Sequence, residues 1–199
     1  MKRPPDQIKA EHGIRLETKR LILREHCMED LVPLHALLSD PRIGWYLPGM
    51  YRTDSAGTEE YLRSMMRDGA SEQRLRCNLA VQLRSTGELI GSVGLHVIDG
   101  TPENAHCGIG YFIRADCWNC GYATEAARAA LDYVFSAGAW RVSASCLAEN
   151  LGSRRVLEKC SMKQEGLLRA HTWHDGRWRD CAVYAVLKDE WIGGNDGVP

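Results

Sequence analysis

The stretch with the clearest chemistry is a strand, a glycine-containing turn and a helix, between Gly110 and Phe135. At the start of a helix the first backbone N–H groups have no intrahelical acceptor, and the helix dipole favours negative charge there. A glycine at that point, here Gly121, removes the side chain that would keep a phosphate away. The stretch therefore predicts an anion site. No Lys-Ser/Thr pair follows as in a P-loop, and the third glycine of a dinucleotide fingerprint is missing, so a plain strand-to-helix turn fits the spacing equally well.

The pair Cys117-x-x-Cys120 has the spacing of a redox dithiol or of half a zinc site. A second cysteine pair at suitable spacing is missing from the sequence. His106-Cys107 and His171-x-x-His174 could complete four ligands in principle, but neither is a standard partner motif. We therefore interpret the two thiols as incidental and expect no metal.

Periodicity predicts the elements that must position the turn. Strands are expected at residues 20–24, 78–84, 88–97, 106–114, 141–147 and 181–187, and helices at 28–38, 58–67, 122–137 and 151–160. Turn residues predict hairpins at 85–87 and at Asp175-Gly176. The order of elements indicates a mixed α/β sheet.

Three local details accompany these elements. Asp40-Pro41 is expected to end the first helix, because a residue before proline is pushed out of the helical region, and a loop should then carry Trp45 and Tyr46. Ser55 or Thr58 is placed to cap the helix over 58–67. Gly108 and Gly110, inside the strand over 106–114, suggest a bulge or a close backbone approach.

The composition limits the expected number of domains, the expected partners and the expected compartment. The chain has 199 residues, 44% hydrophobic and 26% charged, which is typical of one globular domain. Its 25 basic and 26 acidic residues leave a net charge of -1, so nucleic acid and anionic membranes are not expected partners. Eight scattered cysteines, no signal-peptide pattern and no membrane-length apolar run indicate a cytoplasmic protein. Residues 1–14 and 193–199 are expected to be a flexible leader and tail around a domain over 15–192.

The residues around the turn belong to a longer pattern. Its centre is Ile109-Gly110-Tyr111 followed by Trp118-Asn119-Cys120-Gly121-Tyr122-Ala123-Thr124-Glu125-Ala126. Further matches lie at 17–24 and 40–42 upstream, and at Asn150-x-x-Ser153, 157–159, 165–166 and 188–191 downstream. In this order the residues resemble the GNAT acetyltransferases, specifically the RimJ/RimL-type branch that includes ribosomal-protein N-terminal acetyltransferases. The resemblance implies the GNAT fold, an α/β (α+β) architecture with a single mixed, mostly antiparallel sheet flanked by helices.

The resemblance also implies acetyl-CoA as cosubstrate. Its pantetheine would lie beside the backbone of Tyr111, Phe112 and Ile113. Its pyrophosphate would lie on the amides of Asn119, Cys120, Gly121, Tyr122, Ala123 and Thr124. Arg114 and Arg155 are candidates for phosphate contacts, Arg155 for the 3'-phosphate. Asn150 and Ser153 would lie near the thioester, where the Ser153 hydroxyl is a reasonable general acid for the departing thiolate. Asn150 is also a good N-cap for a helix that starts at Leu151, and the two roles are compatible.

The chain departs from its relatives at one catalytic position. Many of them carry a glutamate immediately before the Ile-Gly-Tyr, and this chain has Gly108 there, so a base from that position is absent. His171 and His174, in a hairpin that borders the acceptor site in the family, are the remaining catalytic candidates. Polar residues in a turn are more often simply solvated.

We therefore expect an acetyl-CoA-dependent N-acetyltransferase in which a neutral primary amine attacks the thioester directly. At pH 7 a peptide α-amine needs about 1 kcal/mol to become neutral, whereas a lysine amine needs roughly 5 kcal/mol. A site without an obvious base suits a peptide or protein N-terminus better. The alternatives are a small-molecule amine (amino acid, polyamine or antibiotic) and a non-catalytic acyl-CoA-binding regulatory module. A monomer or a homodimer is expected.

Overall fold

The computed structural model of the chain describes residues 13–47, 49–71, 74–101 and 103–193. An eight-stranded sheet with the order β1-β2-β3-β4-β5-β6-β8-β7 runs through these residues. Its strands are β1 (Arg15–Glu17), β2 (Leu21–Glu25), β3 (Arg76–Leu83), β4 (Leu89–Asp99), β5 (Ala105–Ile113), β6 (Ala139–Leu147), β7 (Lys163–His174) and β8 (Arg177–Leu187). Neighbouring strands of this sheet are antiparallel except β5 and β6. The expected mixed, mostly antiparallel sheet is confirmed.

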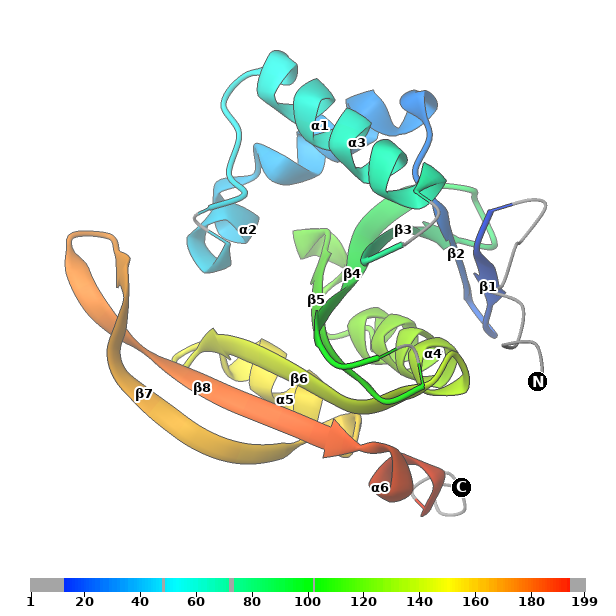
Figure 1. Cartoon of the computed structure of the whole chain (residues 1–199). Helices are drawn as coiled ribbons and strands as arrows, with labels where there is room; N and C mark the ends of the chain where they lie inside the picture. Colours follow the sequence, from blue (N-terminus) through cyan, green and yellow to red (C-terminus); the bar gives the residue numbers. More distant parts are fainter. Residues whose placement is uncertain (1–12, 48, 72–73, 102, 194–199) are drawn as a thin grey trace.

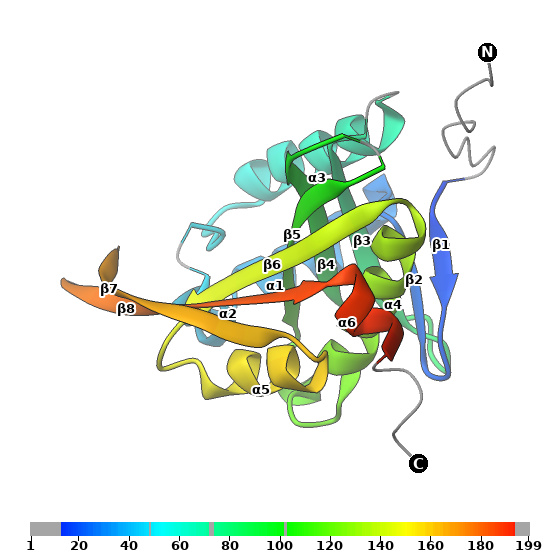
Figure 2. The same cartoon turned by 60° about the horizontal axis from the view of Figure 1, so that its bottom comes forward.

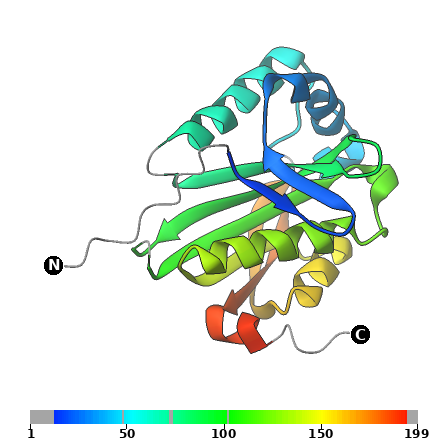
Figure 3. The same ribbon diagram turned by 90° about the vertical axis from the view of Figure 1, so that its right-hand side faces the viewer.

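Helices cover both faces of the sheet (Figures 1 and 3). One face carries η1 (Met28–Asp30), α1 (Leu31–Leu38), α2 (Pro41–Tyr46) and α3 (Ser55–Ala70), and the other carries α4 (Tyr122–Ser136) and α5 (Leu151–Lys159). A short η2 (Ala115–Cys117) precedes α4, and α6 (Lys188–Gly193) follows β8. Each face has its own apolar cluster, so the sheet separates two cores.

The helix expected over 122–137, which has the broadest apolar face in the sequence, is confirmed as α4. Ala126, Ala130 and Leu131 have no exposed surface, and Val134 continues the same stripe. Small alanine side chains let the helix axis approach β4, β5 and β6 closely, which fixes the start of the helix relative to the end of β5.

The segment after α1 corrects one expectation. Asp40 caps a second helix, α2, by accepting a hydrogen bond from the Arg42 amide at 2.9 Å. Because proline at the first helical position lacks only an N–H that would be unpaired anyway, Asp40-Pro41 both ends α1 and starts α2. The expected loop around Trp45 and Tyr46 is therefore wrong.

The cap of α3 is the other correction. Asp54, rather than Ser55 or Thr58, accepts the hydrogen bond from the Gly57 amide at 2.7 Å. Thr58 is instead fully buried and lies 2.8 Å from His35 Nδ1.

Strands β5 and β6 diverge, as Figure 1 shows. Their pairing runs from Ala105↔Ala139 to Gly108↔Ser143. Within these two strands, which are described throughout, residues 109–113 have no partner in β6. The β5 edge is therefore open at residues 109–113, in the strand that leads to the turn before α4. The shift in β5–β6 register lies between Ala105 and His106, so of the two expected alternatives the bulge at Gly108 or Gly110 is not observed, whereas a close approach is observed at Gly108, whose backbone the His96 ring covers.

The β7–β8 hairpin extends beyond the body of the sheet toward α2 (Figures 1 and 2). Its turn at Asp175-Gly176 is confirmed, with φ of +51° and +72°. Such a pair of positive φ values is the backbone of the tight hairpin turns that Asp-Gly favours.

The expected leader and tail lie largely outside the described residues. Of the leader, Ile14 is described and is buried in the core against β2 and β3. The domain boundaries stay a prediction. None of the helices in the described ranges is both long and apolar enough to cross a membrane.

Candidate active site

The start of α4 has the backbone geometry of an anion cradle. Asn119 and Gly121 have positive φ, +61° and +82°, so the chain turns sharply just before the helix. Gly121 is the N-cap and supplies no side-chain acceptor. The amides of Tyr122, Ala123 and Thr124 therefore start the helix without a side-chain cap and with the positive end of its dipole.

Arg20, which the sequence reasoning did not name as a site residue, stabilises this turn. Its Nε lies 2.6 Å from Glu125 Oε2, and another guanidinium nitrogen donates to the Cys120 carbonyl at 2.8 Å. The guanidinium also lies 4.5 Å from the centre of the Tyr122 ring. A fixed cation thus lies beside the cradle. Arg20 and Glu125 are 105 positions apart, so their pairing has no local signal.

Glu125 joins the cradle to the β1–β2 turn. Its Oε1 accepts from the Thr18 hydroxyl at 2.6 Å and from the Arg20 amide at 2.8 Å. Burial alone raises the pKa of this carboxyl, but the hydrogen bonds and the Arg20 charge lower it overall. Glu125 is therefore an ionised anchor of the turn.

The two arginine candidates for phosphate contacts have different surroundings. Arg114 is paired with Asp116 at 2.7 Å and lies 3.6 Å from Glu88. Arg155 is exposed on α5, and no ion pair joins it to another residue in the described part of the chain. Trp118, between the strand and the cradle, donates from its indole nitrogen to the Ile113 carbonyl at 2.7 Å.

Tyr111, Asn150 and Ser153 come together at the start of α5. The Tyr111 hydroxyl lies 3.1 Å from Ser153 Oγ and 3.1 Å from the Ser153 carbonyl oxygen. Asn150 caps α5 by accepting from the Ser153 amide at 3.0 Å, as expected. Burial raises the pKa of Tyr111 well above its usual value, so this hydroxyl stays protonated. Phe112, the next residue, faces the opposite core with α1 and α3.

A cavity of about 550 Å³ lies between α2 and the β7–β8 hairpin. Its lining residues are Trp45, Tyr46, Glu149, Asp175, Arg177 and Arg179. Arg179 is 6% exposed and organises the group: it donates to Glu149 at 2.5 Å and lies 5.2 Å from the centre of the Trp45 ring. The sequence reasoning missed this cavity, because its residues come from three segments that lie far apart in the chain.

The two hairpin histidines also differ. His174 is half-buried, and its ring meets Trp45 edge-on at 4.9 Å between centroids. Its Nε2 is buried and has no hydrogen-bond partner in the described structure. His171 is exposed and lies 3.2 Å from the Thr172 hydroxyl. The structure thus places His174 against the wall of the cavity, while His171 is not among the residues that line it.

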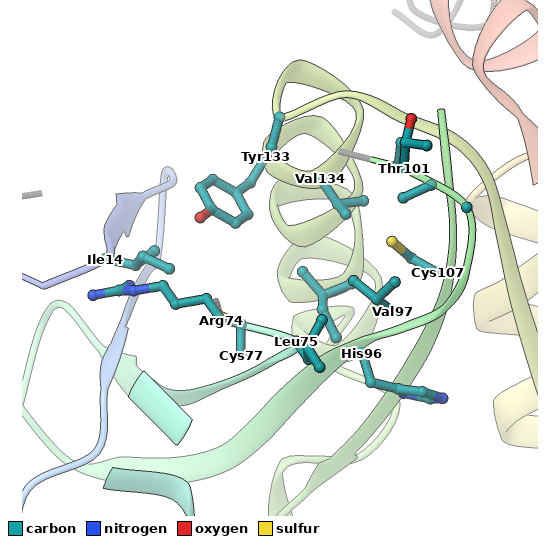
Figure 4. Close-up of a pocket in the computed structure, with 15 residues that line it drawn as sticks. Ile14, Arg74, Leu75, Cys77, His96, Val97, Thr101, Cys107, Tyr133 and Val134 are labelled. Carbon is teal, nitrogen blue, oxygen red and sulfur yellow. The ribbon is translucent and has the colours of Figure 1, made fainter. Parts of the chain in front are cut away.

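A second cavity of about 260 Å³ lies near the C-terminal end of α4 (Figure 4). It is mostly apolar and includes Cys77 and Cys107. Burial raises the pKa of Cys77 to about 12, so this thiol is protonated. None of the site residues expected from the sequence lines this cavity.

Cys117 and Cys120 lie on either side of the chain turn before α4. Cys117 is buried, and burial raises its pKa, whereas Cys120 is exposed. In the described ranges no three His, Cys, Asp or Glu side chains are grouped closely enough to hold a metal ion.

Comparison with known proteins identifies the architecture. The sequence pattern of the acetyltransferase (GNAT) domain matches residues 20–163. The chain belongs to the GNAT acetyltransferase family. It is 32% identical to an uncharacterized N-acetyltransferase, p20, of Bacillus licheniformis, over 89% of this chain and 98% of that protein. It is therefore an acetyl-CoA-dependent N-acetyltransferase.

Two solved GNAT structures share the fold. RimL, a ribosomal L7/L12 α-N-protein acetyltransferase in complex with coenzyme A, has a TM-score of 0.78 at 17% identity, over 89% of this chain and 99% of RimL. A spermidine N-acetyltransferase from Vibrio cholerae, in complex with CoA and spermine, has a TM-score of 0.75 at 22% identity, over 88% of this chain and 99% of that one. At these identities the likeness shows the fold alone, and the two neighbours act on different kinds of amine.

Proposed function

We propose that this enzyme acetylates the α-amine of a peptide or protein N-terminus. The observation that carries the proposal is the charge balance of the 550 Å³ cavity, whose two carboxylates, Glu149 and Asp175, face two guanidinium groups, Arg177 and Arg179. A polyamine would need an excess of carboxylates around its several positive charges. A chain terminus has one ammonium group followed by peptide carbonyls and amides, so it suits a cavity with acceptors and donors in balance.

We propose that acetyl-CoA binds at the divergence between β5 and β6, on the side opposite to the acceptor cavity. The cradle of Asn119 to Thr124 fits a pyrophosphate, because its helix start has no side-chain cap and Gly121 adds no side chain. The open edge of β5 at Tyr111 to Ile113 fits a pantetheine, which carries amides that can pair with a strand edge. Arg155, which has no ion pair with any residue that the structure describes, suits the 3'-phosphate, whereas Arg114 would first have to leave Asp116.

When bound, acetyl-CoA supplies the activated acetyl group. The chain's own residues orient it and manage protons. Tyr111 holds Ser153 by the 3.1 Å contact, and the Ser153 hydroxyl would donate a proton to the leaving sulfur. Asn150 fixes the first turn of α5 and so the position of Ser153. Trp45 and Tyr46 form an aromatic wall of the acceptor cavity.

The eight cysteines are all free, which supports a reducing compartment. We therefore propose a cytoplasmic enzyme, monomeric or homodimeric. The near-neutral net charge gives no support for a nucleic-acid partner.

Competition between acceptors tests the choice of substrate. We would mix acetyl-CoA with three probes: a seryl peptide with a free N-terminus, an N-blocked peptide containing lysine, and spermidine. Mass spectrometry would follow each product, and thiol release the total rate. We expect the free N-terminus to be acetylated fastest. Faster acetylation of the blocked lysine peptide or of spermidine would overturn the proposal.

A free amino acid is the second candidate, because its zwitterion has one ammonium and one carboxylate and so also suits the balanced cavity. Serine and serinamide, added at the same concentration as the seryl peptide, test it. Acetylation of free serine faster than of the peptide would make a small α-amine the substrate.

A further inference from the structure

His96 lies directly opposite Gly108, the position at which the chain lacks the side chain that many of its relatives carry. His96 on β4 and Gly108 on β5 are direct cross-strand partners. A Cβ built on Gly108 would lie 2.2 Å from His96 Cε1 and 2.4 Å from Nε2, far inside contact distance. The imidazole therefore occupies the space that any side chain at residue 108 would need.

This ring lies where β5 and β6 begin to diverge. Gly108 is the last β5 residue paired with β6, through Ser143. The next cross-strand pair on the same face is Gly94 and Gly110, and a Cβ on Gly110 would meet nothing within 4 Å. His96 thus lies next to open space over Gly110 at the open end of the divergence, while the Asn78 side chain lies over Gly94. In Figure 4 its ring points away from the apolar cavity that its backbone helps to line.

The acetyl transfer needs a proton acceptor, and both carboxylates that line the acceptor cavity are already paired with Arg179. Glu149 is already held by Arg179 at 2.5 Å, and Asp175 lies 3.5 Å from the same guanidinium. His96 is exposed, and no hydrogen bond to its ring occurs within the described residues. A ring nitrogen of His96 is therefore available to a molecule from outside the chain.

We propose that His96 is the catalytic base of this acetyltransferase. As the acceptor nitrogen bonds to the acetyl carbon and the carbon–sulfur bond breaks, one amine proton passes to a ring nitrogen of His96. The sulfur leaves as a thiol with a proton from Ser153 or water, Ser153 regains its proton from solvent where it is the donor, and His96 returns its proton to solvent, so atoms and charge balance. The inference rests on the proposed placement of acetyl-CoA along the open edge of β5, but not on which amine is the acceptor.

Charged or titratable groups face this ring from the neighbouring strands. They are Arg76 on β3, the cross-strand partner of His96, and His106 on β5, while Asp99 on β4 and the ion pair of Arg141 on β6 with Glu165 on β7 act on His106. His106 is the natural comparison. Burial and the Arg141 charge lower its pKa, and its Nε2 lies 2.8 Å from the Ser143 hydroxyl, so it already has a partner.

The kinetic test compares His96→Gln with His106→Gln and His174→Gln, using whichever of the seryl peptide, lysine peptide or spermidine the wild type acetylates fastest. We expect His96→Gln to lower kcat by about 10²- to 10⁴-fold and to remove the acidic limb of the pH profile. The His106→Gln variant should stay within about threefold, and His174→Gln, at the wall of the acceptor cavity, should lose less rate than His96→Gln. An unchanged rate and pH profile in His96→Gln, or the larger loss in His106→Gln or His174→Gln, would overturn the proposal.

Gly108→Ala provides a variant in which His96 is still present but displaced. The added methyl group would occupy the place of the ring, so we expect a loss of rate similar to that of His96→Gln. Free imidazole should restore part of the rate in His96→Gly, whose cavity can admit it, and not in Gly108→Ala. Full activity in a folded Gly108→Ala enzyme would show that the ring position does not matter.

Two measurements need no turnover. Calorimetry should give acetyl-CoA the same Kd, within about threefold, for wild type and His96→Gln. In a protein with isotope-labelled histidines, addition of acetyl-CoA should shift the His96 ring resonances more than those of His171. If acetyl-CoA does not bind the wild type, the proposed cofactor site fails. If it binds while the His96 resonances stay unmoved, only the role of His96 fails.

Discussion

The Tyr111 hydroxyl lies 3.1 Å from Ser153 Oγ, and thereby joins the middle of the sheet to the first turn of α5. The contact crosses the space between strand β5 and α5, next to the divergence of β5 and β6. It is separate from the helix cap, because Asn150 binds the backbone amide of Ser153 and not its hydroxyl. Chemistry and helix stability at this residue can therefore be measured independently.

Ser153→Ala tests the hydroxyl. It keeps the amide that Asn150 caps, so we expect the melting temperature to stay nearly unchanged while kcat falls by about 10- to 1000-fold. Asn150→Ala is the matched control, and should lose about 1 kcal/mol of unfolding free energy with the cap. Steady-state kinetics and urea unfolding would follow both variants. Full turnover of Ser153→Ala would assign the serine a structural role only.

Gly121→Asp tests the anion cradle. Asp tolerates positive φ better than most residues, so the variant should fold, but its carboxylate adds negative charge where the pyrophosphate is proposed to bind. We expect calorimetry to show a loss of acetyl-CoA affinity of about 100-fold or more, and a much smaller loss for the uncharged Gly121→Asn. Equal affinities in the Asp and Asn variants would remove the phosphate assignment.

Arg179→Met tests the acceptor cavity. The change keeps most of the buried stem and removes the guanidinium that holds Glu149 and Trp45 in place. We expect KM for the acceptor to rise by about tenfold while the Kd of acetyl-CoA stays constant. Arg63→Met is the control, because Arg63 is exposed on α3 and pairs there with Glu59, outside the acceptor cavity. A similar change in both variants would contradict a specific role for Arg179.

Asp30 should control acid stability. It is buried and accepts two hydrogen bonds from Arg24, at 2.7 and 2.8 Å. Burial raises the pKa of Asp30, but the hydrogen bonds from Arg24 and His26 outweigh burial and hold the pKa far below that of an unfolded Asp. Its stabilisation is therefore complete above the unfolded pKa of about 3.9 and is lost as the pH falls below that value. Between pH 5 and 2, the unfolding free energy in urea should fall more steeply for wild type than for Asp30→Asn; parallel slopes would contradict this.

The cysteine pair before α4 should be dispensable. Cys117 is buried as a protonated thiol and Cys120 is exposed, and direct transfer to an amine requires no thiolate. We expect Cys117→Ala/Cys120→Ser to retain acetyl transfer within about threefold, and elemental analysis to find no stoichiometric zinc. Unfolding of the wild type on addition of a chelator would reveal a metal site.

The sequence by itself determined the elements whose signals are local. The alanine stripe of α4 identifies a buried helix face, Asn150 identifies the start of α5, and Asp175-Gly176 identifies a tight hairpin turn, because each depends on residues within one or two turns of chain. The order of matched residues from Glu17 to Trp191 was enough to predict the family. Where local rules allow two outcomes, as at Asp40-Pro41, the prediction chose the wrong one, since proline both ends one helix and starts the next.

The tertiary structure alone decided which distant side chains share a site. Arg20 reaches Glu125 and Arg179 reaches Trp45 only because the sheet order brings β2 beside α4 and the hairpin beside α2. The same holds for His96: the sequence shows that Gly108 lacks a side chain, but not that the histidine on the neighbouring strand occupies the space. Register between strands is set by packing across the whole sheet, and no pattern within one strand contains that information.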